Sequence, residues 1–181
     1  MSWSAFKSTL LPAMQSHTFG NNMAGFAKTF ALAYDTAIKA GHESISPIPL
    51  MKGNPAAMEA QIVAFLSQTQ MSNSLTLLDV LGPAVITYWT GGLMMPLPPL
   101  PPAPGSIKNI SLTQGVVLNP GVWTPIPVPP NNNPSTFLDA FIAAAKIHLT
   151  TVSGLYVTVS AYPPFGSPAP GALPWVGYMV P

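Results

Sequence analysis

The sequence contains no cysteine and no arginine. Without cysteine the chain has no disulfides, no thiolate metal ligands and no cysteine nucleophile. Nucleic-acid binding relies on clustered Lys and Arg against phosphates and on the arginine fork against base edges. The six lysines are scattered singly, and the formal net charge is only +1. We therefore expect no nucleic acid among the partners of this protein.

Charged residues of either sign are scarce, at 6% of the 181 residues, where an average soluble domain has about 25%. A compact monomer of 19.0 kDa exposes roughly 8,000 Å², which leaves about 700 Å² of surface for each charged side chain. Soluble monomers intersperse charges and keep apolar patches small. This composition predicts that much of the surface is buried against other subunits.

A long uninterrupted hydrophobic run is also missing. The most apolar window, residues 75–95, is broken by Asp79, Pro83 and the pair Gly91-Gly92. Its apolar part is shorter than the ~20 residues that a membrane-spanning helix needs. Residues 1–16 have one lysine and no sustained apolar stretch, unlike a signal peptide. We expect no membrane span.

Motifs of catalysis and cofactor binding are absent as well. The histidines His17, His42 and His148 do not show the spacing of metal ligands, and four of the five acidic residues occur singly in helical patterns. There is no nucleophile elbow and no glycine-rich phosphate loop. The sequence predicts no enzyme, no cofactor and no metal site.

Four segments do show the apolar spacing of amphipathic helices. The first follows Asn21 or Asn22 and runs to Gly41, the second starts at Asn54 and Pro55, and the third starts at the cluster Ser72-Asn73-Ser74. Within the third, which ends at Trp89, Pro83 should kink the helix or restart it. The fourth would run from Pro134 to a C-cap at Gly154. In the resulting core, we expect the stripe Phe26, Phe30, Tyr34 and Ile38 to pack against Ile62, Phe65, Leu66, Phe137 and Phe141.

Prolines are abundant, with six of them between residues 96 and 104. Such a segment cannot be helical and should run as polyproline II at about 3.1 Å per residue. The β-prone runs 110–113 and 115–118 precede the turn signal Asn119-Pro120-Gly121, which predicts a weak hairpin. Residues 155–162 alternate between apolar and polar, which is typical of a half-buried strand.

The last 19 residues have no charge and carry three aromatic residues on a Pro- and Gly-rich backbone. We expect this tail to be ordered only through contact with another subunit or with the body. The fold class is mainly α, with about four helices, a minor β component and long Pro-rich extended segments. The expected parts are a helical body (1–92), a Pro-rich strap with the weak hairpin (93–133), a helix and strand returning to the body (134–162) and an extended C-terminal arm (163–181).

The segments "FAKTFALAYDTAIKAG", "YWTGG" and "LPPLPPAPG" resemble small virion structural proteins of tailed bacteriophages, especially contractile-tailed, T4-like marine phages. The similarity covers about residues 20–125 and lies in the general character of the sequence, since no motif in it is diagnostic. It implies a repeated copy in a neck, tail, baseplate or capsid, and it supplies no functional residues.

Composition and resemblance together predict a structural subunit of a symmetric multi-copy assembly. Its partners would be copies of itself and other virion structural proteins, in a virion assembled in the host cytoplasm. Two alternatives stay open: a module that binds a hydrophobic or carbohydrate ligand through Tyr88, Trp89, Trp123 and Trp175, and a small membrane-associated protein. The candidate interface anchors are Pro98, Pro99, Pro101, Pro102, Trp123, Phe165, Trp175 and Tyr178.

Overall fold

The computed structural model describes residues 2–15, 22–44, 49–68, 74–94, 109–126, 133–161 and 169–181. In these residues the helices are α1 (Trp3–Gln15), α2 (Met23–Lys39), α3 (Pro55–Gln68), α4 (Ser74–Trp89) and α5 (Pro134–Thr151). The strands are β1 (His42–Glu43), β2 (Leu50–Lys52), β3 (Leu93–Met94), β4 (Asn109–Asn119), β5 (Ser153–Ala161), β6 (Ala169–Val176) and β7 (Tyr178–Met179). The prediction of a mainly helical protein with a minor β component is confirmed.

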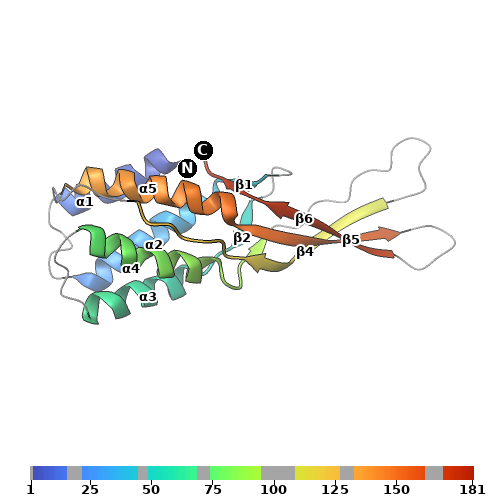
Figure 1. Cartoon of the computed structure of the whole chain (residues 1–181), viewed down its shortest axis with the longest axis horizontal. Coiled ribbons are helices and arrows are strands. Elements are labelled where there is room, and N and C mark those ends of the chain that lie inside the picture. Colours follow the sequence, from blue (N-terminus) through green and yellow to red (C-terminus); the bar gives the residue numbers. More distant parts are fainter. Residues whose placement is uncertain are drawn as a thin grey trace.

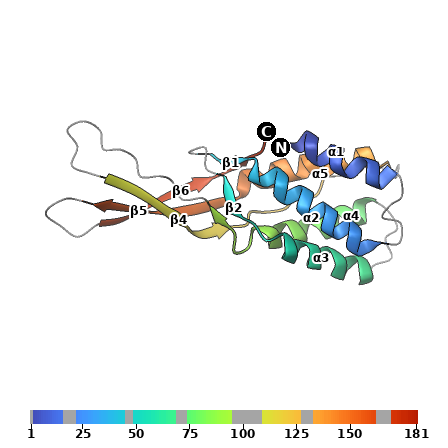
Figure 2. The same cartoon turned by 180° about the vertical axis from the view of Figure 1, so that it is seen from behind.

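The helices lie side by side at one end of the molecule, and the sheet of β4, β5 and β6 projects from the other end (Figure 1). Figure 2 shows the same elongated arrangement from behind. The two termini meet where the helices give way to the sheet, and the Trp3 amide donates to the Pro181 carbonyl at 3.1 Å. The chain therefore closes on itself at the base of the projecting sheet.

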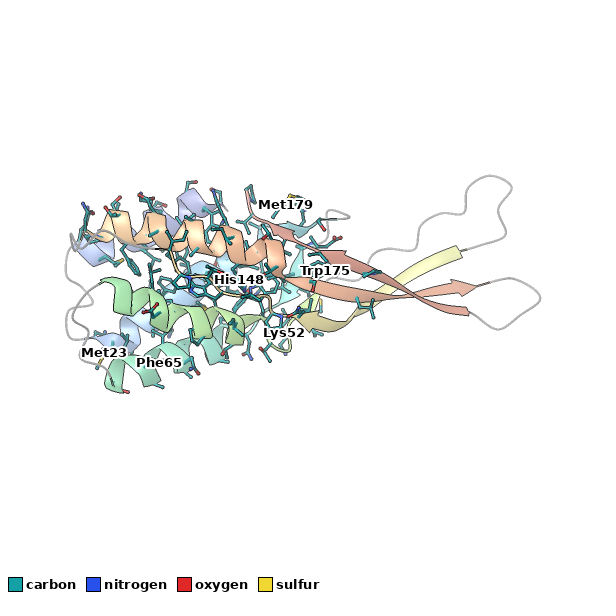
Figure 3. The ribbon with its side chains drawn as sticks, in the orientation of Figure 1. Met23, Lys52, Phe65, His148, Trp175 and Met179 are labelled. Carbon is teal, nitrogen blue, oxygen red and sulfur yellow. The ribbon has the colours of Figure 1, made fainter. Side chains whose placement is uncertain are left out.

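An aromatic cluster holds the helical body together. The ring of Phe30 on α2 lies 5.4 Å from that of Phe6 on α1 and 4.8 Å from that of Phe141 on α5, both edge to face. The predicted stripe on α2 is buried, and Ile62 and Phe141 belong to the same core. Phe65 is an exception, because it is only half-buried and lies outside this core. Figure 3 places it at the end of the body remote from the sheet.

The sequence did not lead us to expect α1. Its core residues Trp3, Phe6 and Leu10 have helical spacing, and the Ser2 carbonyl accepts from the amides of residues 5 and 6. The helix accommodates Pro12, which is exposed and lies in the last turn. The sequence therefore does contain a helix signal, which is a short apolar stripe that follows Ser2.

One alternative for Pro83 and one predicted helix end need correction. Pro83 lies inside the single helix α4, so it does not restart a new helix, and the alternative of a kink stays a prediction. Helix α5 starts as predicted, with the Asn133 side chain accepting from the Ser135 amide at 2.9 Å, but it ends at Thr151. Gly154 is not its C-cap and belongs to β5, where a Cβ atom would lie 2.6 Å from the Trp175 ring.

The sheet has the antiparallel order β4-β5-β6. Strand β4 pairs with β5 from Asn109 opposite Ala161 to Asn119 opposite Ser153, with register shifts between 112 and 117. The predicted weak hairpin is therefore wrong: both β-prone runs belong to one strand, whose partner comes more than 30 residues later in the chain. The predicted strand after residue 154 is confirmed as β5.

Replacing Phe30 by Ala should cost roughly 3–5 kcal/mol of unfolding free energy, because the ring is fully buried and makes two aromatic contacts. Phe65→Ala is the matched control and should cost much less, since its ring is half-buried. Chemical denaturation followed by circular dichroism measures both. Equal costs would show that the core is not centred on Phe30.

Candidate interaction surface

The C-terminal residues are fixed inside the chain by Tyr178, which is 3% exposed. Its hydroxyl donates to the Ile38 carbonyl at 2.8 Å and accepts from the Leu50 amide at 2.9 Å. Its ring lies 5.2 Å from that of Trp89. Burial raises the pKa of Tyr178, which keeps the hydroxyl protonated as a donor. One side chain thus joins the end of α2, strand β2 and helix α4.

Strand β7 approaches α2 closely because residue 41 is a glycine. A Cβ atom there would lie 2.2 Å from the Met179 carbonyl oxygen. Trp175, 1% exposed, covers Gly154 in a similar way. The prediction of Trp175 and Tyr178 as anchors on a neighbouring subunit is therefore corrected: both are buried against their own body. Of the two expected sources of order for the tail, the body supplies it for residues 169–181.

The prolines of the tail lie in a paired strand, and not in the unpaired extended arm that the sequence predicted. Strand β6 pairs with β5 along its whole length, with Pro170 opposite Val159 and Pro174 opposite Leu155. A proline cannot donate to a ladder and is tolerated on an edge strand, which is where β6 lies.

A polar cluster joins α2 to α4, with Lys39 at its exposed end. The Tyr88 hydroxyl donates to Asp35 Oδ1 at 2.8 Å, Lys39 Nζ contacts Asp35 Oδ2 at 2.8 Å, and Trp89 Nε1 donates to the Tyr34 hydroxyl at 3.2 Å. Burial, and then the negative charge of Asp35, raise the pKa of Tyr88. These groups satisfy one another, so Tyr88 and Trp89 close the core and do not form a surface platform for a ligand.

Trp123 anchors the extended segment that follows β4. The predicted turn is present, with Gly121 at φ +78° and its amide donating to Asn119 Oδ1 at 3.1 Å. The chain then runs back along the helices (Figure 1), where the Val122 amide donates to Thr151 Oγ1 at 2.8 Å. The half-buried Trp123 ring lies 5.6 Å from Phe141. Trp123 thus packs on its own chain.

His148 holds the start of the same segment. It lies in the interior of the body (Figure 3), its Nε2 is 2.6 Å from the Pro120 carbonyl oxygen, and its ring is 5.9 Å from that of Trp123. Burial lowers the pKa of His148 to about 4, so the ring is neutral near pH 7 and Nε2 carries the donated proton. The histidine is a structural donor.

The other predicted anchors cannot be placed. Pro98, Pro99, Pro101, Pro102 and Phe165 lie outside the described residues, as does the proline rod of residues 96–104. Their role in assembly stays a prediction.

An open apolar groove lies between α1 and α2 and was missed at the sequence level. It holds about 310 Å³ and is lined by Ala5, Phe6, Thr9, Thr29, Leu32, Ala33, Thr36 and Ala37. The three threonine hydroxyls donate to carbonyls of their own helix, at residues 5, 25 and 32, so they need no outside partner. No charged side chain lines the groove. Leu32 is 50% exposed and was not noticed because it falls off the core stripe of α2.

The projecting sheet is a second unusual surface, because its strands carry no charge. Strands β4, β5 and β6 have 11, 9 and 8 residues, and none of these is Asp, Glu, Lys or Arg. In an average soluble domain about a quarter of them would be charged. The far half of the sheet extends beyond the ends of the helices (Figures 1 and 2).

Among the described residues, no three His, Asp or Glu side chains lie close enough together to hold a metal ion. None of the helices in the described part of the chain has the length and apolar character needed to cross a membrane. Comparison with protein-family models, with curated proteins and with solved structures gives no match. The function must therefore be argued from these surfaces.

Tyr178→Phe should lower the unfolding free energy by about 1–3 kcal/mol, because it leaves the buried Leu50 amide without its acceptor. The Ile38 carbonyl retains the Gly41 amide as a donor, so a second penalty of that size is not expected. Thermal unfolding gives the cost, and faster hydrogen exchange at Leu50 locates it. Unchanged stability would contradict the anchoring role of Tyr178.

Acid should weaken the fold through His148. Its pKa is depressed from 6.5 to about 4, so the unfolded chain takes up a proton that the folded chain does not. Stability should therefore fall as the pH is lowered from about 6.5 to about 4, by roughly 3 kcal/mol in total. His148→Gln keeps a donor for Pro120 and should flatten this part of the stability profile relative to the unsubstituted protein. An unchanged slope in this variant would contradict the assignment.

Proposed function

We propose that this chain is a structural subunit of a symmetric, multi-copy assembly and that this assembly is a phage virion. Its partners are further copies of itself and other virion structural proteins, and it has no catalytic role. The virion assignment comes from the resemblance of residues 20–125, and the assembly assignment comes from the surfaces described above.

The observation that carries the proposal is the uncharged sheet that stands out from the helical body. An isolated soluble protein that exposes a sheet of this kind usually protects it with charged side chains, above all on the edge strands. Here β6 carries prolines, but no strand of the sheet carries a charge. Burial against neighbouring subunits accounts for that absence, because a subunit interface is depleted of charge at its centre.

The total surface supports the same conclusion. The chain exposes 9324 Å² and has six basic and five acidic residues, which is about one charge per 850 Å². Two of the acidic residues, Asp35 and Glu43, are buried, so the exposed surface carries even fewer charges. Repeated heterologous contacts, as in rings and lattices, would cover such a surface efficiently.

The ligand-binding alternative finds little support in the aromatic residues that suggested it. Tyr88, Trp89 and Trp175 are buried in the core, and Trp123 packs against Phe141 and His148. Three of these rings are buried and the half-buried Trp123 packs on its own chain, so together they form no stacking platform.

Size-exclusion chromatography with light scattering, without detergent, tests the proposal. We expect a discrete particle whose mass is a whole multiple of 19.0 kDa at tens of micromolar protein, with the same helical circular dichroism as a dilute sample. Negative-stain microscopy should show rings or a regular lattice. A monodisperse 19.0 kDa species over the whole concentration range would contradict the proposal.

A further inference from the structure

The groove between α1 and α2 and the side chain of Leu32 form a matching hole and knob on one face. Small side chains of α2 and α1 line most of the hole, and Leu32, which is half-exposed, is one of the lining residues. A face that carries both a knob and a hole can pair with an identical face about a two-fold axis, since each knob then enters the hole of the other copy. We propose that this groove binds α2 of a second copy of the chain, with Leu32 of each copy seated in the groove of its partner. This inference rests on the proposed function, because it names one contact of the assembly.

The chemistry of the groove favours a helix over a small ligand. A ligand pocket encloses its ligand and offers a few polar groups that orient it. This groove is open along the helices, and the hydroxyls of Thr9, Thr29 and Thr36 are already bonded to backbone carbonyls, at 2.9, 2.8 and 2.7 Å. What the threonines and alanines offer to a partner is methyl groups and a close approach, which suits helix–helix packing at 8–10 Å between axes.

The charges around the groove are compatible with self-pairing. In an antiparallel arrangement centred on Leu32, residues four positions before it face residues four positions after it in the other copy. Lys28 of one copy then faces Thr36 of the other, so the two Lys28 side chains are not opposed. Lys39 is held by Asp35 of its own chain at 2.8 Å. Lys7, the charged residue of α1, is likewise held by Asp139 of its own chain.

The size of the face suits one contact among several. Helices of 13 and 17 residues, side by side, present a face of roughly 20 by 25 Å. This is about 500 Å² if the face is treated as flat and the unevenness of its side chains is ignored. Specific interfaces that are stable on their own bury at least about 600 Å² per partner. This contact would be weak alone and stable within a multi-copy particle.

The test uses two charge substitutions on the groove and two matched controls on α5. Leu32→Glu and Thr36→Lys alter the groove, whereas Ile147→Glu and Thr150→Lys make the same changes of charge on another exposed face. The match is close: Leu32 and Ile147 are 50% and 47% exposed, and the Thr36 and Thr150 hydroxyls donate to the carbonyls of Leu32 and Ile147, both at 2.7 Å. All four variants should fold, since all four side chains are exposed.

We expect each groove variant to shift the association midpoint, measured by light scattering, to at least tenfold higher protein concentration, and each control to leave it unchanged. If wild type assembles and the groove variants assemble equally well, or if the controls weaken assembly as much, the groove contact is wrong and the proposed function stands. If wild type itself stays monomeric at all concentrations, both proposals fail.

Discussion

The Tyr178 hydroxyl is the contact on which the rest of the arrangement depends. It bridges the last turn of α2 to β2, through the Ile38 carbonyl and the Leu50 amide, while its ring packs on Trp89 of α4. Around it, the Gly177 amide donates to the Val152 carbonyl at 2.8 Å, and Gly177 can turn the chain there because its φ is +93°. Helix α5, β5 and β6 are thereby fixed to the same point. The sheet projects as it does because its base is held in the helical core.

This docking changes where an assembly surface can lie. A tail with Trp175 and Tyr178 in the core is not free to bind a neighbour, and neither is Trp123, which packs on Phe141. The scarcity of charge then has to be explained by other surfaces. The described residues offer two of them, the charge-free strands of the projecting sheet and the groove that contains Leu32.

Local signals in the sequence predicted the elements well where side chain and backbone interact within a few residues. Asn22 caps α2 by accepting from the Gly25 amide at 2.8 Å, and Asn133 with Pro134 starts α5. Pairing between distant segments could not be predicted in this way. The runs before Asn119 are equally suited to a local hairpin and to a long strand, and only the position of β5 against the body decides between them. The prolines of the tail suggested an unpaired arm. An edge strand also tolerates proline, but the sequence does not show that β5 is its partner.

The candidate surface was harder to predict than the fold. Aromatic residues on a proline-rich backbone are typical of interface anchors, but the same residues fill a core when the tail returns to the body, as Tyr178 does. Leu32 gave a weaker signal, a single large apolar residue off the core stripe of α2, and such residues are common on ordinary surfaces. Its meaning depends on the neighbouring helix α1, whose Ala5 and Thr9 complete the groove and which the sequence did not lead us to expect.

The central claim is that the C-terminal residues belong to the core of their own chain, so that assembly uses other surfaces. Hydrogen exchange of the Leu50 and Gly177 amides, measured at protein concentrations above and below the association midpoint, tests it directly. The account predicts strong protection that does not change on dilution, because the Leu50 amide donates to the Tyr178 hydroxyl and the Gly177 amide to the Val152 carbonyl of the same chain. Loss of that protection in the dilute, dissociated protein would contradict the account, since it would mean that a neighbouring copy holds the tail.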